Sequence, residues 1–237
     1  MKQIQVSLEG AHIMVGMPTY QQIPVWTTKS LLSTQELIRT KSLKLGHSFV
    51  IGCSIVQKAR DEVAQLFLES DCTHLFWIDS DMVWNAEDFL RLVIISSETK
   101  IACGAYPAKV DDGPVTFFVK TPNGVRTVNE DYGLYEIDGI GLGFFCMTRE
   151  VVQALADQAP TIWDDVLDHP RPSIFRVDTT EAGYRGTAGR FRSEDMAFCQ
   201  DIRDLGYKIY LDPKVELGHV GLKVYKGSIK DAIQVAY

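Results

Sequence analysis

The sequence predicts an α/β protein whose core is a mostly parallel central sheet flanked by helices. Two observations support this. Strand-like apolar runs alternate with helix-like segments through the first hundred residues. One run, residues 74–78, is apolar after its first residue and shows no alternation, as expected for a strand buried on both faces. Because ligands of such sheets bind beyond the carboxyl ends of the strands, that edge is where we expect a site.

The first half of the chain is expected to hold four strands and three helices in alternation, joined by right-handed crossovers. Apolar residues at helical spacing between residues 56 and 67 predict an amphipathic helix directly before the central strand. The expected strands are residues 12–17, 48–52, 74–78 and 101–104, and the expected helices are residues 28–45, 56–67 and 86–97.

After residue 105 the pattern becomes mixed. A hairpin is expected between residues 115–119 and 124–128, because Pro122-Asn123-Gly124 is a turn sequence. Residues 160–192 predict a long irregular segment, of the kind that forms lids or binding loops. Further strands are expected at 135–137, 144–147 and 207–211, and helices at 149–157 and 193–205. We therefore expect one domain over residues 1–237, with halves of about 1–105 and 106–237.

Composition narrows the class of protein. With 46% hydrophobic and 23% charged residues, the 237-residue chain is typical of soluble globular proteins, and a cytoplasmic location is expected. The net charge of −7 gives no general attraction to nucleic acid. Arg185, Arg190 and Arg192 form a local basic cluster that is also typical of a solvated loop. Five cysteines, without metal-site spacing, favour reduced thiols over a disulfide framework.

Two carboxylates follow the central strand, in the sequence Asp79-Ser80-Asp81. Side chains two apart on an extended chain point the same way, so these carboxylates are able to converge on one cation. Hard oxygen ligands suit Mg²⁺ or Mn²⁺. The alternative is a polar turn that caps the next helix. Asn85, followed by acidic residues, already supplies a helix start, which favours the metal site.

Other candidates have equally ordinary alternatives. Glu194 and Asp195 begin an expected helix after Ser193. One of them is a candidate general base, and the alternative is that both only stabilise the start of the helix. His219 is either a metal ligand, which would favour Mn²⁺, or a structural histidine. Arg60 is able to pair with a diphosphate or to lie exposed on its helix.

The glycines of the chain do not form the motifs of the common nucleotide-binding folds. Gly141 and Gly143 either let the backbone approach a substrate or mark a bulge. No Gly-x-Gly-x-x-Gly follows the first expected strand, and no phosphate-binding loop with Gly-Lys-Ser/Thr is present in the sequence. A dehydrogenase and a phosphate-loop nucleotidase are therefore not expected.

Taken in order, these motifs resemble one family. They are Pro18-Thr19-Tyr20, Asp79-Ser80-Asp81, Gly141-Leu142-Gly143, Glu194-Asp195, Gly206-Tyr207 and His219. The series resembles the nucleotide-sugar glycosyltransferases of the GT-A (Rossmann-like) fold, close to the compact family-2-like enzymes of bacteria and bacteriophages. The resemblance spans roughly residues 12–221. It implies a mostly parallel sheet, a smaller mixed acceptor-side portion, a nucleoside-diphosphate sugar as donor and no membrane insertion.

The resemblance also implies roles for residues of the donor site. Pro18 and Tyr20 would lie by the nucleobase, and Arg60 near the ribose or diphosphate. Ser80 would lie beside the nucleotide sugar. Asp79 and Asp81 would hold a Mn²⁺ or Mg²⁺ ion bound to the diphosphate.

For the transfer step, the resemblance implies a base and a further ligand. His219 would complete the metal site, while Gly141 and Gly143 would flank the donor sugar or the acceptor. Asp195, with Glu194 as second candidate, would deprotonate the acceptor hydroxyl, which implies inversion; a retaining reaction stays open.

The acceptor is left open between a surface glycan and a hydroxymethylated pyrimidine in phage DNA, which would place the enzyme in a bacterium or an infected host cell. The Gln-x-x-Arg-Trp segment and membrane helices of processive synthases are absent from the sequence. A nucleotidyltransferase is one alternative, although residues 17–20 do not form its glycine-rich, lysine-bearing loop. A catalytically inactive sugar- or nucleotide-binding module is the other.

Overall fold

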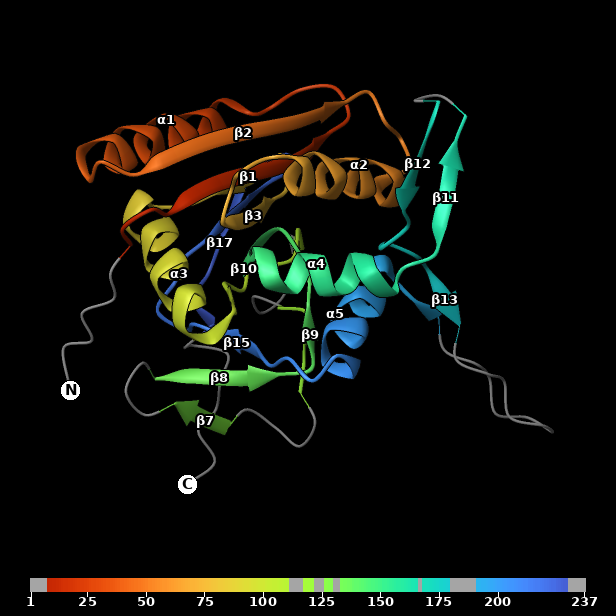
Figure 1. The fold of residues 1–237 in the computed structure, drawn as a ribbon. Coiled ribbons are helices and arrows are strands. Elements are labelled where there is room, and N and C mark those ends of the chain that lie inside the picture. The colour runs from red at the N-terminus through yellow and green to blue at the C-terminus, as the bar shows by residue number, and fades with distance from the viewer. Residues whose placement is uncertain are drawn as a thin grey trace.

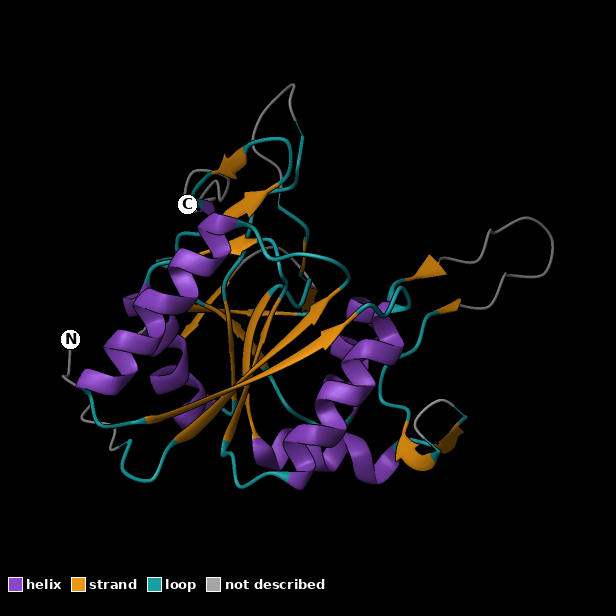
Figure 2. Ribbon diagram, turned by 90° about the horizontal axis from the view of Figure 1, so that it is seen from above, coloured by secondary structure: helices purple, strands orange, loops and turns teal. Residues whose placement is uncertain are grey.

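The central feature of the protein, seen in a computed structural model, is an eight-stranded sheet with helices on both faces (Figures 1 and 2). The structure describes residues 8–110, 117–121, 126–129, 133–165, 168–179 and 191–229. None of the helices in these ranges has the length and apolar character needed to span a bilayer. All five cysteines lie in the described ranges as free thiols, which confirms that prediction.

The sheet has the strand order β2-β1-β3-β10-β5-β15-β8-β7. Strands β10 and β8 run antiparallel to both of their neighbours, and the remaining six strands share one direction. The predicted mostly parallel sheet is therefore confirmed. Its strands are β1 (His12–Thr19), β2 (Lys44–Ile51), β3 (His74–Ile78), β5 (Ile101–Cys103), β7 (Arg126–Asn129), β8 (Leu134–Ile137), β10 (Phe144–Thr148) and β15 (Ile209–Leu211).

Side chains alternate between two apolar cores, one on each face of the sheet. Ile13 and Val15 of β1 enter one core, while Met14 enters the other. The first core is closed by α1 (Val25–Thr40) and α3 (Ala86–Thr99). The second is closed by α2 (Val56–Glu69), α4 (Arg149–Gln158) and α5 (Glu194–Asp204).

The predicted central strand is confirmed as β3, and all five of its residues are buried. Its one polar residue, His74, bonds the Thr73 hydroxyl through Nδ1 and the Ser97 hydroxyl through Nε2. Burial lowers the pKa of His74 to about 4, so the ring is neutral at pH 7. A neutral ring with both nitrogens bonded is compatible with the middle of the sheet.

The helix expected at residues 28–45 is displaced, and that boundary prediction is wrong. Helix α1 ends at Thr40, and Leu45 already belongs to β2, which pairs in parallel register with β1 from Lys44 onward. The buried face of α1 carries hydroxyl groups. Ser30 Oγ lies 2.9 Å from the Trp84 carbonyl oxygen, and the Trp84 indole N–H donates to Thr34 Oγ1. Apolar spacing did not identify that face because its partners come from a distant loop.

Two further predictions about the second half are wrong for the described residues. The expected hairpin does not form: β6 (Val119–Lys120) pairs with β9 (Gly139–Ile140), and β7 pairs with β8. The expected irregular segment contains two short ribbons, and its Arg185 and Arg190 lie outside the described ranges. These ribbons pair β11 (Thr161–Asp164) with β12 (His169–Pro172), and β13 (Asp178–Thr179) with β14 (Phe191–Arg192).

A small second sheet lies beside the carboxyl edge of the main one. Its order is β17 (Val224–Lys226), β16 (Gly218–Val220) and β4 (Met82–Val83), all antiparallel. Strand β4 begins directly after Asp81, and β16 contains His219. The pairing therefore joins residues 218–220 to the segment that follows the central strand.

Candidate active site

Nearly all of the predicted site residues line one cavity of about 540 Å³ at the carboxyl edge of the main sheet. The segments after β1 and β3 reach this edge because those strands run in one direction, and the first turn of α5 closes it. The predicted residues that line the cavity are Pro18, Tyr20, Arg60, Asp79, Ser80, Asp81, Glu194, Asp195 and His219. Among them, Tyr20 exposes 57% of its surface, which leaves its ring free at the cavity mouth.

The small sheet brings Asp81 and His219 together. His219 pairs with Met82 across β16 and β4, and the Val220 N–H donates to the Asp81 carbonyl oxygen. His219 Nε2 lies 3.4 Å from Asp81 Oδ1. The Nδ1 atom lies 3.0 Å from the Pro107 carbonyl oxygen, which only accepts, so Nδ1 carries the proton of that bond.

This tautomer makes Asp81 and His219 fit a divalent cation. With Nδ1 protonated, a neutral His219 points its Nε2 lone pair at a carboxylate, an arrangement that needs a cation or a proton between them. Metal-ligating histidines usually donate their second nitrogen to a carbonyl or carboxylate in this way. In the structure, Lys109 Nζ pairs with the other carboxylate oxygen of Asp81, Oδ2. In the absence of an ion, Nε2 needs a proton of its own to face Asp81: burial opposes the charge on Asp81, but hydrogen bonds from the doubly protonated His219 and from Lys109 hold its pKa below the usual value.

Asp79 and Asp81 line the same cavity but have different partners. The Met82 N–H donates to the Asp79 carbonyl oxygen, so residues 79–82 form a turn rather than a continued strand. The Asp79 carboxylate consequently faces Arg60, at 3.2 Å from Nη2, while Asp81 faces His219. The extended geometry that predicted convergence does not continue beyond Ile78.

Arg60 is buried between three carboxylates. Its Nη1 contacts Asp195 and lies 3.4 Å from Glu194, and its Nη2 contacts Asp79. Burial alone would lower the pKa of Arg60, but Asp195, Asp79 and Glu194 raise it, so the guanidinium stays charged. Arg60 therefore joins α2 to both acidic segments of the site and is not an exposed helix charge.

Asp195 lies in an environment that raises its affinity for a proton. Burial, together with Asp79 and Glu194, raises the pKa of Asp195 to about 6, although the Arg60 charge opposes the shift. A carboxylate with a pKa close to neutral accepts a proton better than an ordinary aspartate does. Ser193 precedes α5 but makes no side-chain capping hydrogen bond, and Asn85 makes none at α3.

The two candidate glycines lie against Tyr106, which the sequence reasoning missed. A Cβ atom at Gly141 would overlap the Tyr106 hydroxyl, and one at Gly143 would lie 2.8 Å from the ring. The same Cβ at Gly143 would lie 3.1 Å from an Asp79 carboxylate oxygen. The Tyr106 ring meets the His219 ring edge-on, with centroids 5.2 Å apart. The close approach predicted for these glycines is thus made by a tyrosine of the protein.

A second cavity, of about 560 Å³, adjoins the first and shares Asp195 with it. Phe117, Phe118 and Val119 line one side, with Gly141 and Tyr106 also in its wall. Tyr106 and Lys109, the missed residues, follow β5, which runs parallel to the strands that carry the other site residues. The rule that sites lie beyond the carboxyl ends of strands was the signal available for them.

Structural comparison identifies this fold. The crystal structure of GalNAc-T7 with UDP, GalNAc and Mn²⁺ matches with a TM-score of 0.53 and 12% sequence identity, over 89% of this chain and 44% of that one. The chain has the GT-A fold. It spans less than half the length of GalNAc-T7. At this identity the match shows the fold alone, so the chemistry must be argued from the site.

Two other solved structures match more weakly. One is a 4-diphosphocytidyl-2C-methyl-D-erythritol synthase from Anaerococcus prevotii, with a TM-score of 0.36 and 14% identity, over 67% of this chain and 81% of that one. The other is a glycosyltransferase involved in the glycosylation of the major capsid of PBCV-1, with a TM-score of 0.34 and 13% identity, over 64% and 69%. No family model matches the sequence, and no curated protein does.

Proposed function

We propose that the protein is a metal-dependent glycosyltransferase that moves a sugar from a nucleoside diphosphate to an acceptor hydroxyl. The observation that carries the proposal is the shared cavity of Asp81, His219 and Asp195 at the carboxyl edge of a GT-A sheet. A cation ligand pair and a carboxylate base are the two parts that such a transfer needs. GalNAc-T7 was crystallised with UDP and Mn²⁺, which makes these the first ligands to test.

The donor would lie in the 540 Å³ cavity, with its nucleobase at Pro18 and Tyr20. Asp81 and His219, with Asp79 nearby, would hold a Mn²⁺ or Mg²⁺ ion, which neutralises charge on the diphosphate as a Lewis acid. Ser80 lies in the same wall. Because Arg60 already pairs with three carboxylates, its part in donor binding is to fix those carboxylates in position.

The acceptor would enter through the second cavity, whose wall includes Asp195. The acceptor oxygen attacks the anomeric carbon, its proton passes to Asp195, and the bond from that carbon to the diphosphate breaks. Attack from the side opposite the diphosphate inverts the configuration. Glu194 is the second candidate base. Both a surface glycan and a hydroxymethylated pyrimidine stay as acceptors to be tried, since each presents a hydroxyl group next to a face that Phe117 and Phe118 are able to cover.

A thermal-shift experiment with UDP, with and without Mn²⁺, tests the donor part. A ligand that binds only the folded state at 100 times its Kd stabilises the protein by about 2.7 kcal/mol, which is about 5–11 °C in Tm for a chain of this size. We expect the shift to need both ligands and to be lost in Asp81→Asn. The exposed Asp157→Asn serves as the control and should shift like the wild type.

A shift with UDP that does not depend on metal or on Asp81 would contradict the metal assignment. Hydrolysis of UDP-sugars by the wild type but not by Asp195→Asn would support the transfer. Pyrophosphate release from a nucleoside triphosphate would instead favour the nucleotidyltransferase alternative, and tight UDP binding without turnover would favour the binding module.

A further inference from the structure

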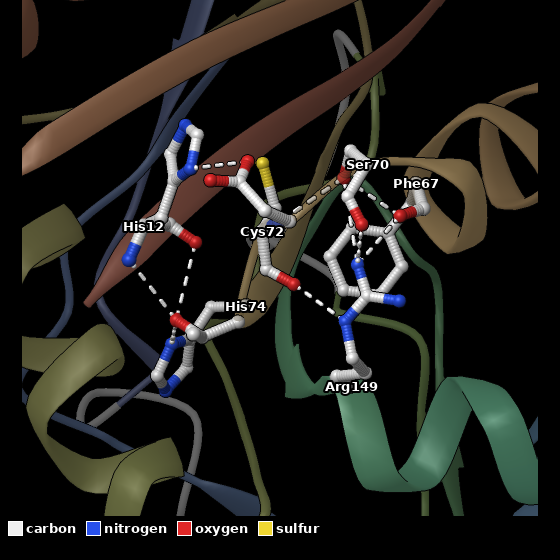
Figure 3. A network of polar contacts seen from close by, with 8 residues as sticks. His12, Phe67, Ser70, Cys72, His74 and Arg149 are labelled. Atoms are coloured by element: carbon white, nitrogen blue, oxygen red, sulfur yellow. Dashed lines mark hydrogen bonds and ion pairs between the residues drawn. The ribbon is translucent and has the colours of Figure 1, made fainter. Parts of the chain in front are cut away.

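A second cluster of metal-ligating side chains lies at the opposite edge of the sheet, at the start of β1 and in the turn before β3. His12 begins β1 and Cys72 lies between α2 and β3 (Figure 3), and Asp71 directly precedes Cys72 in the chain. One ligand atom from each residue, a ring nitrogen, a carboxylate oxygen and the thiol sulfur, lies within 4.8 Å of the other two. The cluster is separate from the cavity described above, because β1 and β3 reach that cavity by their carboxyl ends.

The polar partner of the His12 ring is the carboxylate of Asp71. The buried Nδ1 atom of His12 lies 2.9 Å from an Asp71 carboxylate oxygen. Cys72 is 2% exposed, and its sulfur lies within 4.8 Å of both of the other ligand atoms. A nitrogen, an oxygen and a sulfur are ligands that zinc takes in proteins, at about 2.0–2.3 Å.

The backbone around the cluster is fixed by hydrogen bonds. The Thr73 hydroxyl lies 3.0 Å from the His12 backbone nitrogen, which donates to it, and 3.1 Å from the His12 carbonyl oxygen. The Arg149 guanidinium donates to the carbonyl oxygens of Phe67, Ser70 and Cys72 (Figure 3). These contacts hold the turn against β1 independently of any ion. Preorganised backbone lowers the cost of binding, because little has to be ordered.

We propose that His12, Asp71 and Cys72 bind a zinc-class divalent ion, with water in the fourth position. The ion would join the start of β1 to the turn before β3, and it would stabilise the sheet rather than take part in transfer. Ligand atoms of a tetrahedral zinc lie about 3.3–3.7 Å apart, so the Asp71 oxygen, at 2.9 Å from His12 Nδ1, would move away from the ring slightly. Asp71, whose side chain is 77% exposed, has room for that adjustment.

Cobalt binding tests the proposal, because Co²⁺ replaces zinc and gives a thiolate-to-cobalt absorption band when a cysteine is bound. Protein dialysed against a chelator is titrated with Co²⁺ alone. We expect a band that saturates at one ion per chain, is reversed by Zn²⁺ and is lost in Cys72→Ser. Cys53→Ser is the matched control, since Cys53 lines the other cavity and its variant should keep the band.

Asp71→Asn supplies a variant that folds whatever the ion does, because its side chain is exposed. Outer-shell partners alone change metal affinity by about 10–100-fold, so loss of this ligand should weaken Co²⁺ binding by at least about tenfold. Zn²⁺ should raise the Tm of the wild type and of Asp81→Asn, which separates this site from the diphosphate site. Absence of the band in the wild type, or its survival in Cys72→Ser, would overturn the proposal.

Discussion

Replacement of Gly141 by alanine tests the close fit between the glycine loop and Tyr106. The added Cβ would overlap the Tyr106 hydroxyl and lie 3.0 Å from the ring carbon that bears it. The tyrosine must therefore move, and it would leave its edge-on contact with the His219 ring. Overpacking of this kind costs about 1–3 kcal/mol, and the aromatic contact accounts for about 0.5–1.5 kcal/mol of it.

Urea denaturation followed by tryptophan fluorescence measures this cost. We expect Gly141→Ala to lose about 1–3 kcal/mol of unfolding free energy, or about 2–4 °C in Tm per kcal/mol. Gly46→Ala is the control, because its Cβ would meet no atom closer than 3.9 Å. In the Tyr106→Phe background, which lacks the overlapping hydroxyl, Gly141→Ala should cost less, and a double-mutant cycle gives the coupling. Equal costs of Gly141→Ala in the two backgrounds would refute the reasoning.

Three further predictions concern charged groups. Burial raises the pKa of Asp195 to about 6, so kcat/KM for transfer should fall as the pH drops below about 6, and Asp195→Asn should lose about 10²-fold or more. Lys109→Met removes a competitor for the Asp81 carboxylate, so calorimetry should show Mn²⁺ bound more tightly, by up to about fivefold. Asp61→Ala leaves the buried N–H groups of Ile174 and Phe175 without their acceptor and removes one of the two carboxylates paired with Arg171, so urea denaturation should show a loss of about 3 kcal/mol. A flat pH profile, unchanged Mn²⁺ affinity or unchanged stability would contradict these in turn.

The centre of the sheet could be predicted from local pattern because strands β3, β5 and β10 are largely apolar in themselves. The apolar residues of β3 predict a buried strand by their own character, without knowledge of the residues that pack against them. Helix α1 shows the limit of that reasoning. Its buried Ser30 and Thr34 form hydrogen bonds with Trp84, about fifty residues away in the chain. From the local sequence alone, a hydroxyl group with such a distant partner cannot be distinguished from one exposed to solvent. Tertiary hydrogen bonds thus override hydrophobic periodicity.

The same distinction applies to the candidate site. The sequence left His219 open between a metal ligand and a structural histidine, because strands as short as β4 and β16 carry no periodicity that would place it, and the resemblance alone favoured the first role. Ion pairs with Lys109 and the packing of Tyr106 depend on where the segment after β5 turns, which local sequence does not determine.

Arg60 is different, since its environment was present in the sequence. Along α2 the buried positions include Ala59, Val63 and Phe67, and Arg60 lies on that same stripe. A guanidinium on the apolar face of an amphipathic helix must be paired, because burial of an unpaired charge costs several kcal/mol. The acids that follow β3 and begin α5 are the groups able to pair with it, because both lie at the carboxyl edge of the sheet. We expected Arg60 to pair with a diphosphate or to lie exposed, but the helix pattern and the acidic motifs, taken together, already implied the Arg60 cluster that the structure contains.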